Sequence, residues 1–323
     1  MARGKRRCGG IRVAIEGYLT NVRNNLGRKS GIPIDALAHI RRFNRAVTRQ
    51  VGALNSSFLD RGRPLGSARV LNAIGRGQGD VAKLRQALAL DSGLMSRLLR
   101  GLEAEGLIVV EDDPEDGRRR IARLTEAGQA EFAEYERLSD AQAADILSRH
   151  PDRSALLAAM DLIATALTRA EIEIVPCDPL DPRARDCLAQ YYAELSARFE
   201  GGFDVNLSKD PEADDMRPPR GTFLLALSDG VPVGCAALKG GADYAEVKRV
   251  WIAPAARGLG LARQLMEAIE AAARDLGQLH LRLDTNSALP EAVAMYHRFG
   301  WEEIDRFNDD PYPDRFFEKR LNP

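Results

Sequence analysis

The sequence predicts two domains, a mainly α-helical domain followed by an α+β domain with a mixed sheet. Its 323 residues, of which 45% are hydrophobic and 29% are charged, are enough to form two cores. Between residues 33 and 168 the apolar residues recur every three or four positions, as in amphipathic helices. Between residues 171 and 323 short β-forming runs alternate with helical segments, so the domain boundary is expected near residue 170.

Charge divides the chain in a similar way. The overall net charge is −1, but residues 1–32 carry about +7, residues 33–170 about +1 and residues 171–323 about −9. The basic N-terminal extension, residues 1–32, is interpreted either as a solvated tail or as an arm on DNA phosphates. Charged residues interrupt the segment where a signal peptide would be apolar, and no run is long enough to span a bilayer. A cytoplasmic protein without a membrane partner is therefore expected.

The four cysteines predict neither a disulfide framework nor a metal site. They are scattered, with no C-x-x-C pair and no histidine nearby at ligand spacing. We therefore expect reduced thiols and no bound metal. The cysteines are Cys8, Cys177, Cys187 and Cys235.

A helix-turn-helix motif is predicted within the first domain. The run DVAKLRQALALDSGLMSRLLRGLEAEGLIVV reads as a short helix, a turn at Ala89 and Leu90, and a second helix with Asp91 as its N-cap. The inward stripe of the second helix is expected at Leu94, Leu98 and Leu102. Its outward surface is small and basic, which suits the DNA major groove, and comprises Ser92, Gly93, Ser96, Arg97 and Arg100.

An arginine-tipped hairpin is predicted directly after this motif. In LIVVEDDPEDGRRRIARLT two short strands flank a turn at 114–117. The tip and the descending strand carry a group of basic residues, namely Arg118, Arg119, Arg120 and Arg123. A helix-turn-helix followed by such a hairpin predicts a winged helix.

Residues 33–168 resemble the MarR family of winged helix-turn-helix regulators. The resemblance is carried by SGLMSRLLRGLEAEGLI, by Asp116 and Arg118 in EDGRRR, and by Leu124 and Thr125 at the start of the next helix. It implies a homodimer, built from the first helix and the last two, that binds duplex DNA at a palindromic operator. One departure is Val110, where a basic residue often begins the wing.

The same resemblance implies roles for the wing residues. Asp116 would steady Arg118, while Arg119 or Arg120 would reach the minor groove. The alternative interpretation is that these arginines only solvate a loop.

In the second domain a glycine-rich turn joins a strand to an amphipathic helix in VWIAPAARGLGLARQL. Free amides at a helix N-terminus, glycines that permit close approach and the charge of Arg257 together predict a phosphate site. A Walker loop is excluded because no Gly-Lys-Ser/Thr follows. The dinucleotide fingerprint begins well at Gly258 and Gly260 but meets Arg263 where a small residue is needed.

The surrounding segments predict an α+β sheet domain. Strands are expected in EIEIVP, TFLLALS, VPVGCAALK, YAEVKRVWIA, HLRLDT and RFFEKRL, and helices after Asp181, after Gly258 and between Pro290 and Phe299. With R-x-x-G-x-A in the turn, LDTN on the next strand and AVAMYHRFGW on the following helix, residues 171–323 resemble the GNAT family of acyl-CoA-dependent N-acyltransferases.

This resemblance implies acetyl-CoA as the acyl donor and a small-molecule amine as the acceptor. The strand backbone would hold the pantetheine arm, a bulge there would free an amide for the thioester carbonyl, and the turn would hold the pyrophosphate. An asparagine would bond the pantetheine amides. The expected cofactor-binding residues are Val250, Trp251, Ile252, Arg257, Gly258, Leu259, Gly260, Leu261, Ala262 and Asn286.

Acetyl transfer to an amine needs a base and an acid. An alkylamine titrates near ~10 and arrives protonated at neutral pH, so its proton must be removed. The resemblance makes Glu246 the candidate base, with an exposed strand glutamate as the alternative. It makes Tyr296 the candidate acid for the leaving thiolate, with a core tyrosine as the alternative.

The acceptor and the role of the fusion are less well defined. Aspartate-rich segments at 201–220 and 308–317 flank the expected amine entrance, which indicates either a cationic acceptor or solvated loops. The leading interpretation is an active N-acetyltransferase joined to a dimeric DNA-binding domain. The alternatives are a regulator whose second domain only senses acetyl-CoA or another ligand, and a winged helix that serves only in dimerisation.

Overall fold

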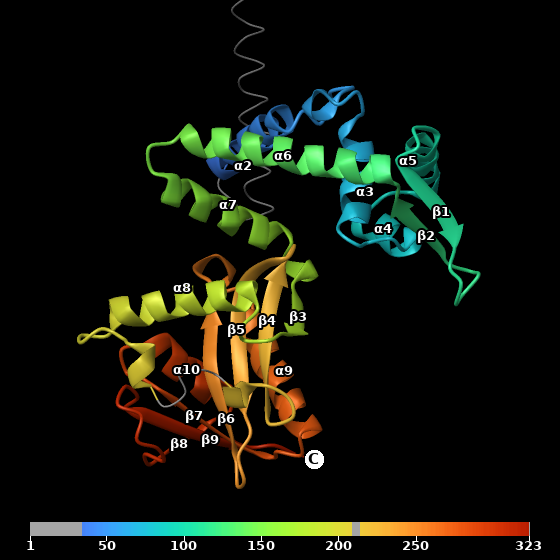
Figure 1. Ribbon diagram of the computed structural model, residues 1–323. Coiled ribbons are helices and arrows are strands. Elements are labelled where there is room, and N and C mark those ends of the chain that lie inside the picture. Colours follow the sequence, from blue (N-terminus) through green and yellow to red (C-terminus); the bar gives the residue numbers. More distant parts are fainter. Residues whose placement is uncertain (1–33, 209–213, 323) are drawn as a thin grey trace, which may run out of the picture. The chain divides into compact units, whose positions relative to one another are not determined.

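The computed structural model describes residues 34–208 and 214–322 (Figure 1). The chain divides into two compact units, Met1–Arg149 and His150–Pro323. The basic extension 1–32 and Cys8 lie outside the described residues. Within the described ranges, no helix combines the length and the apolar character that crossing a membrane requires.

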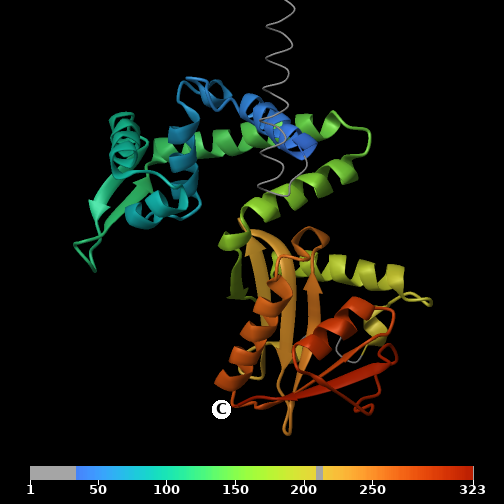
Figure 2. The ribbon, with the colours of Figure 1, turned by 180° about the vertical axis from the view of Figure 1, so that it is seen from behind.

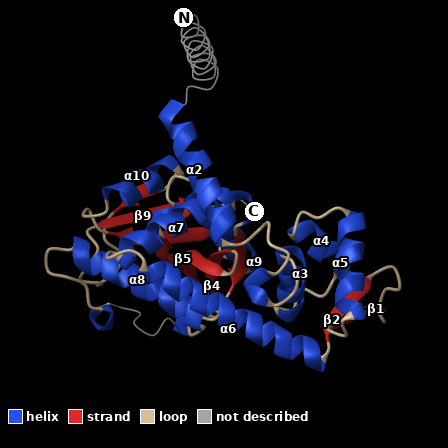
Figure 3. Cartoon of the chain, turned by 90° about the horizontal axis from the view of Figure 1, so that it is seen from above, coloured by secondary structure: helices blue, strands red, loops and turns tan. Residues whose placement is uncertain are grey.

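The first unit is helical except for one hairpin, which Figure 3 shows in red among blue helices for the described part of the unit. The strands β1 (Ile108–Asp112) and β2 (Arg120–Leu124) pair antiparallel. This order of elements confirms the predicted winged-helix fold. The helices are α2 (Ile34–Gln50), α3 (Leu65–Gly75), α4 (Val81–Ala87), α5 (Ser92–Ala104) and α6 (Glu126–Ser148), with a 3-10 turn η1 (Phe58–Asp60).

Local capping explains where the two helices of the helix-turn-helix begin. The carboxylate of Asp91 accepts a hydrogen bond from the amide of Leu94 at 2.8 Å, which confirms the predicted N-cap of α5. Asp80 caps α4 in the same way. Between them Ala89 adopts a left-handed φ of 50°, so the predicted turn is present.

The inward face of α5 differs from the predicted stripe. Met95, Leu99 and Leu102 are fully buried against the core of the unit, which includes α3. Leu94 and Leu98 are only half-buried; Leu98 still packs against this core, whereas the prediction is wrong at Leu94. The buried face lies one residue further along the helix, because the packing against α3 decides which side of the leucine-rich surface turns inward.

The second unit contains a sheet with the strand order β3-β4-β5-β6-β7-β9-β8. All neighbouring pairs are antiparallel except β6–β7, which confirms the predicted mixed sheet. The strands are β3 (Glu173–Pro176), β4 (Gly221–Ser228), β5 (Val231–Lys239), β6 (Ala245–Ile252), β7 (His280–Thr285), β8 (Glu302–Ile304) and β9 (Arg315–Arg320). The sequence did not predict β8, which is too short to show alternation.

Helices cover both faces of this sheet. In Figures 1 and 2, which are opposite views, α8 lies in front of one face and α9 in front of the other. The helices are α7 (Arg153–Leu167), α8 (Pro182–Arg198), α9 (Leu261–Asp275) and α10 (Pro290–Arg298), with 3-10 turns η2 (Arg169–Glu171), η3 (Val205–Leu207), η4 (Asp214–Met216) and η5 (Pro254–Ala256).

Helix α7 was assigned by its sequence to the first domain, whereas its contacts place it in the second unit. It packs against η5, and Thr165 on it is 3% exposed. Directly after the helix, the hydroxyl of Thr168 hydrogen-bonds to that of Ser228 on β4 at 2.8 Å. The predicted boundary at 168–171 marks the change of secondary structure, and periodicity cannot show which core a helix joins.

Candidate functional site

Strands β6 and β7 separate near the centre of the sheet. They pair in parallel from Ala245 and Leu281 to Val247 and Leu283, and β6 then continues to Ile252 without β7 beside it. The exposed edge of β6 therefore carries backbone groups that the sheet does not use. Helix α9 begins just beyond this edge, after η5.

A β-bulge lies on the opposite edge of the same stretch. The register with β5 shifts between Cys235 and Ala237, so that Arg249 and Val250 of β6 together face one residue of β5. Arg249 has a φ of 54°, in the left-handed region that residues other than glycine rarely adopt. The bulge expected in this strand from the sequence is therefore present.

A groove of about 510 Å³ runs from the exposed edge of β6 to the start of α9. Helices α8 and α10 form its other walls. Of the predicted cofactor-binding residues, Leu259 and Asn286 do not line the groove. Those that do are Val250, Trp251, Ile252, Arg257, Gly258, Gly260, Leu261 and Ala262.

The turn before α9 owes its conformation to two glycines. Gly258 and Gly260 have φ values of 77° and 88°, and Gly260 is the N-cap of the helix. A Cβ at either position would meet no atom within 4 Å, so backbone conformation rather than crowding requires glycine. The first amides of α9 face the groove with the positive end of the helix dipole, a suitable place for an anion.

Arg257 is held at the groove by a residue that the sequence did not reveal. Its Nε donates to the carbonyl of Ile252 at 3.0 Å, and its Nη2 donates to Glu194 of α8 at 2.5 Å. Glu194 also accepts a hydrogen bond from Nε1 of Trp251 at 2.8 Å. Burial opposes ionisation, but the hydrogen bonds from Trp251 and Arg257 hold the pKa of Glu194 below its usual value. No local motif marks this glutamate, which is 63 residues away in sequence from Arg257.

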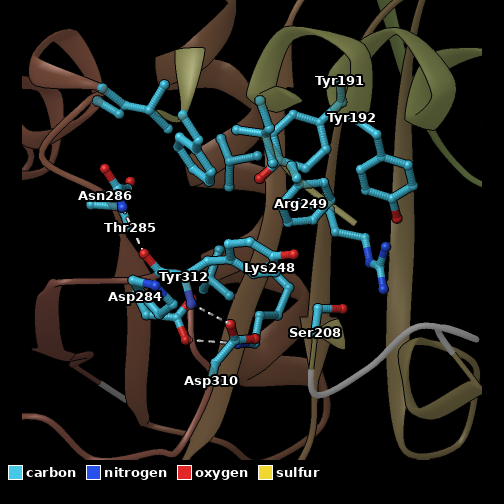
Figure 4. A pocket seen from close by; sticks show the side chains of 18 of the residues that line it. Tyr191, Tyr192, Ser208, Lys248, Arg249, Asp284, Thr285, Asn286, Asp310 and Tyr312 are labelled. Carbon is cyan, nitrogen blue, oxygen red and sulfur yellow. Dashed lines mark hydrogen bonds and ion pairs between the residues drawn. The ribbon is translucent and has the colours of Figure 1, made fainter. Parts of the chain in front are cut away.

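A smaller cavity, of about 130 Å³, adjoins the groove (Figure 4). Tyr296 of α10 and Tyr191 of α8 line both spaces, so the two meet at these phenols. Tyr296 is 5% exposed, and its hydroxyl makes no hydrogen bond within the described ranges. Burial raises the pKa of both phenols, which therefore keep their protons at neutral pH. The sequence identified Tyr296 but missed Tyr191.

Charged side chains form one wall of this cavity. The ammonium group of Lys248 lies 2.8 Å from Asp284 and 3.2 Å from Glu246. Burial opposes its charge, but these two carboxylates raise the pKa of Lys248 above its usual value. Glu246, the predicted base, lines neither the cavity nor the groove, because it is turned to Lys248.

Asn286 lines the smaller cavity and not the groove where pantetheine contacts were expected. Its Nδ2 donates to the carbonyl of Tyr312 at 2.6 Å, and its Oδ1 accepts from the amide of Ala288 at 2.8 Å. The side chain thus joins the end of β7 to the segment before β9. This arrangement supports the cavity wall.

Within the described residues, several aspartates of the aspartate-rich segments make local contacts. Asp215 pairs with Arg220 at 2.8 Å, and Asp314 accepts a hydrogen bond from the amide of Ser287 at 2.7 Å. Asp310 lines the cavity and accepts from a backbone amide two residues on. The acidity of these segments is therefore no direct indication of a cationic acceptor.

The residues predicted to contact DNA form an exposed surface of the first unit. On α5 they are Ser92, Gly93, Ser96, Arg97 and Arg100, and on the hairpin they are Arg118, Arg119 and Arg120. The structure brings each group together on its own element.

Two details of the wing differ from the implied roles. Asp116 accepts a hydrogen bond from the backbone amide of Arg118 at 3.1 Å, so it orders the turn through the main chain. Arg119 pairs with Asp80 at 2.8 Å and with Asp113 at 3.3 Å. The amide of Lys83 and the guanidinium of Arg119 hold the pKa of Asp80 below its usual value. Arg119 therefore ties the wing to the start of α4.

The described residues contain no group of three or more His, Cys, Asp or Glu side chains that could hold a metal ion. Within the described ranges Cys177, Cys187 and Cys235 are free thiols. Burial raises the pKa of Cys177, and the neighbouring Cys187 together with burial raises that of Cys235, so neither is a thiolate at neutral pH.

Comparison with known proteins agrees with this architecture. The acetyltransferase (GNAT) family matches residues 188–301, and the MarR family matches residues 62–119. An uncharacterized N-acetyltransferase of Schizosaccharomyces pombe is 34% identical over 122 residues, which are 35% of this chain and 75% of that protein. The IAA acetyltransferase of Azospirillum brasilense is 32% identical over 145 residues, which are 42% of this chain and 92% of that protein.

Among solved structures, a putative acyl-CoA N-acyltransferase from Klebsiella pneumoniae is 28% identical, with a TM-score of 0.40. The alignment covers 47% of this chain and 99% of that one. The family matches follow the order of the two units described above. The chain therefore belongs to the GNAT family of N-acetyltransferases, with a MarR-family winged-helix domain preceding the acetyltransferase domain.

Proposed function

We propose that the protein transfers an acetyl group from acetyl-CoA to a small-molecule amine, and that its MarR-family domain binds duplex DNA as a homodimer. The observation that carries the first part is the meeting of the groove and the smaller cavity at Tyr296. Two adjoining spaces of unequal size suit a long donor in one and a small acceptor in the other. The acetyl group would be transferred from the donor to the acceptor at their common boundary.

The groove has the features that acetyl-CoA requires. The left-handed turn at Gly258 and Gly260 and the first amides of α9 suit its pyrophosphate. The exposed edge of β6 offers backbone groups to the pantetheine arm, and the bulge at Val250 releases the regular pairing beside the thioester. We propose that Arg257 binds the pyrophosphate, exchanging its contact with Glu194 for the phosphate oxygens.

Tyr296 is our proposed general acid. Its raised pKa keeps the phenol protonated, and its hydroxyl is available at the boundary of the two spaces. During transfer the amine nitrogen bonds to the acetyl carbon, the carbon–sulfur bond breaks, and the thiolate takes the phenol proton. Solvent returns a proton to the phenol before the next turnover.

For Glu246 we propose an indirect role. Lys248 stands between its carboxylate and the cavity, so direct removal of the amine proton would need a rearrangement. Glu246 instead fixes Lys248, which in turn fixes Asp284 in the cavity wall. The ammonium form of the amine loses one proton to solvent before the attack, and the second proton, which the nitrogen releases as the amide forms, also leaves to solvent within the cavity.

The DNA-binding part of the proposal is supported by the exposed basic residues of α5 and the hairpin. Arg118 and Arg120 are the wing residues that we propose for the minor groove, since Arg119 is committed to Asp80. A homodimer is supported by Ile40, Phe43 and Val47 of α2, which are 55%, 38% and 39% exposed at helical spacing. Such an apolar face is typical of a contact with another chain.

The test uses the full-length protein with acetyl-CoA and a panel of small primary amines. Release of free coenzyme thiol together with the mass of the acetylated product would support the transfer. Binding of acetyl-CoA without turnover of any amine would contradict the proposed transfer. It would favour the alternative that the second domain only senses acetyl-CoA. For the first unit, a gel shift with random duplex DNA at low salt tests binding, and absence of a shift would leave dimerisation as its role.

A further inference from the structure

Four consecutive residues of β6, 247–250, line the smaller cavity. In a regular strand successive side chains point to opposite faces, so four in a row cannot reach one space. The bulge and the left-handed φ of Arg249 break the alternation and turn this side chain to the cavity. A left-handed backbone conformation at a residue other than glycine costs free energy. Residues in this conformation are found mainly at binding and catalytic sites.

The surroundings of Arg249 suit an anion that arrives with the acceptor. Its guanidinium carbon lies 5.5 Å from the centre of the Tyr192 ring, and burial lowers its pKa. Figure 4 shows Arg249 beside Tyr192, away from Asp284 and Asp310. A guanidinium has five N–H donors in a planar fork, so it can accommodate a carboxylate beside its other contacts. Lys248 is held between two carboxylates, Asp284 and Glu246.

Aromatic rings form another part of the cavity wall. The ring of Phe203 lies 4.7 Å from that of Tyr312 and 5.5 Å from that of Tyr192, and Phe199 lies 6.0 Å from Tyr312. The cavity volume is about 130 Å³. A space of about 150 Å³ binds benzene, so one apolar side group of that order fits here.

We propose that the acceptor is a free α-amino acid with an apolar side chain, and that Arg249 binds its carboxylate. The inference rests on the proposed acetyl transfer and specifies its second substrate. The side chain packs on the aromatic rings, and the amino group is directed to Tyr296, where the cavity meets the groove. The products are an N-acetyl amino acid and free coenzyme A, with the proton transfers given above.

The test compares each amino acid with the amine that lacks only its carboxylate. L-phenylalanine is paired with phenethylamine, and L-leucine with 3-methylbutylamine, in steady-state assays of the full-length protein. The wild type should prefer the carboxylated member by at least about tenfold in kcat/KM, since a charge-assisted pair contributes on this scale. Arg249→Met should lower that ratio about 10- to 100-fold, and Arg249→Lys should lower it less.

Two controls separate recognition from folding. Arg185→Met makes the same substitution on the exposed surface of α8, outside the cavity, and should leave the ratio unchanged. Calorimetric binding of acetyl-CoA by Arg249→Met should match the wild type, because the groove does not include this residue.

The outcomes distinguish this inference from the proposed transfer. Equal turnover of both members of a pair by the wild type would overturn the carboxylate site. Turnover of other amines, such as spermidine, without any amino acid would overturn the acceptor class while acetyl transfer stands. If no amine were acetylated, the transfer would fail, and this inference with it. A ratio unaffected by Arg249→Met would remove Arg249 from recognition.

Discussion

The two units of this protein present their functional groups in opposite ways. In the first unit the residues proposed to meet DNA are exposed on α5 and the hairpin. In the second unit Tyr296, Lys248 and Asp284 are almost buried around a small cavity. Buried charges are weakly screened, whereas exposed charges are surrounded by water and salt. Single substitutions should therefore have large effects in the second unit and small, distributed effects in the first.

The largest effect is expected at the glycine turn. Gly260→Asp would put a carboxylate at the proposed pyrophosphate site and weaken acetyl-CoA binding by more than about 100-fold, measured by calorimetry. Gly277→Asp is the matched control, because Gly277 is also left-handed, with a φ of 73°, and lies outside the groove. Affinity for DNA should not change in either variant. Tight coenzyme binding by Gly260→Asp would place the phosphate site elsewhere.

Tyr296→Phe should have the next largest effect. It removes one hydroxyl and almost no volume, so acetyl-CoA should still bind, while kcat falls by about 10²-fold. Tyr191→Phe removes a second phenol from the same boundary and should lower kcat much less. The comparison of kcat and KM for the two variants assigns the acid. Equal losses would show that either phenol, or neither, supplies the proton.

A smaller effect is expected for Glu246→Gln. If Glu246 fixes Lys248, kcat should fall by about tenfold or less, at every pH tested. A lost general base would instead cost about 10²-fold or more at neutral pH. That loss would be relieved at high pH, where more of the amine, with its pKa near ~10, arrives deprotonated. A full pH profile of kcat/KM distinguishes these two roles. Recovery of activity at high pH would show that Glu246 is the general base.

The smallest effects belong to the exposed surface of the first unit. Arg118→Ala should weaken DNA binding severalfold and reduce the slope of log affinity against log salt by about 1. Arg119→Ala should keep that slope, because its guanidinium is paired with Asp80 and Asp113, but should loosen the wing and lower the melting temperature slightly. Fluorescence anisotropy of labelled DNA over a salt series measures the affinity and the salt slope of both variants. A changed slope for Arg119→Ala alone would reverse the assignment.

Local signals allowed much of the fold and one half of the site to be predicted from the sequence. The N-cap at Asp91, the strands of the mixed sheet and the glycine turn all depend on residues close together in the chain. Periodicity, capping and left-handed glycines are local properties, so they can be recognised in the sequence without the tertiary structure. For this reason the sequence identified the part of the groove that comes from the continuous stretch 250–262, whereas the walls from α8 and α10 were largely missed.

The tertiary structure alone decided where separate segments meet. The smaller cavity, the proposed acceptor site, combines α8, β6, the end of β7, α10 and the segment before β9, and its aromatic wall has no sequence signature. Which face of α5 is buried, which core α7 joins and which way Glu246 turns all depend on packing partners far away in the chain. Even Arg249 reaches the cavity only because a register shift against β5 breaks the alternation of its strand. Strand register and helix packing are set by the whole core, and no local pattern contains that information.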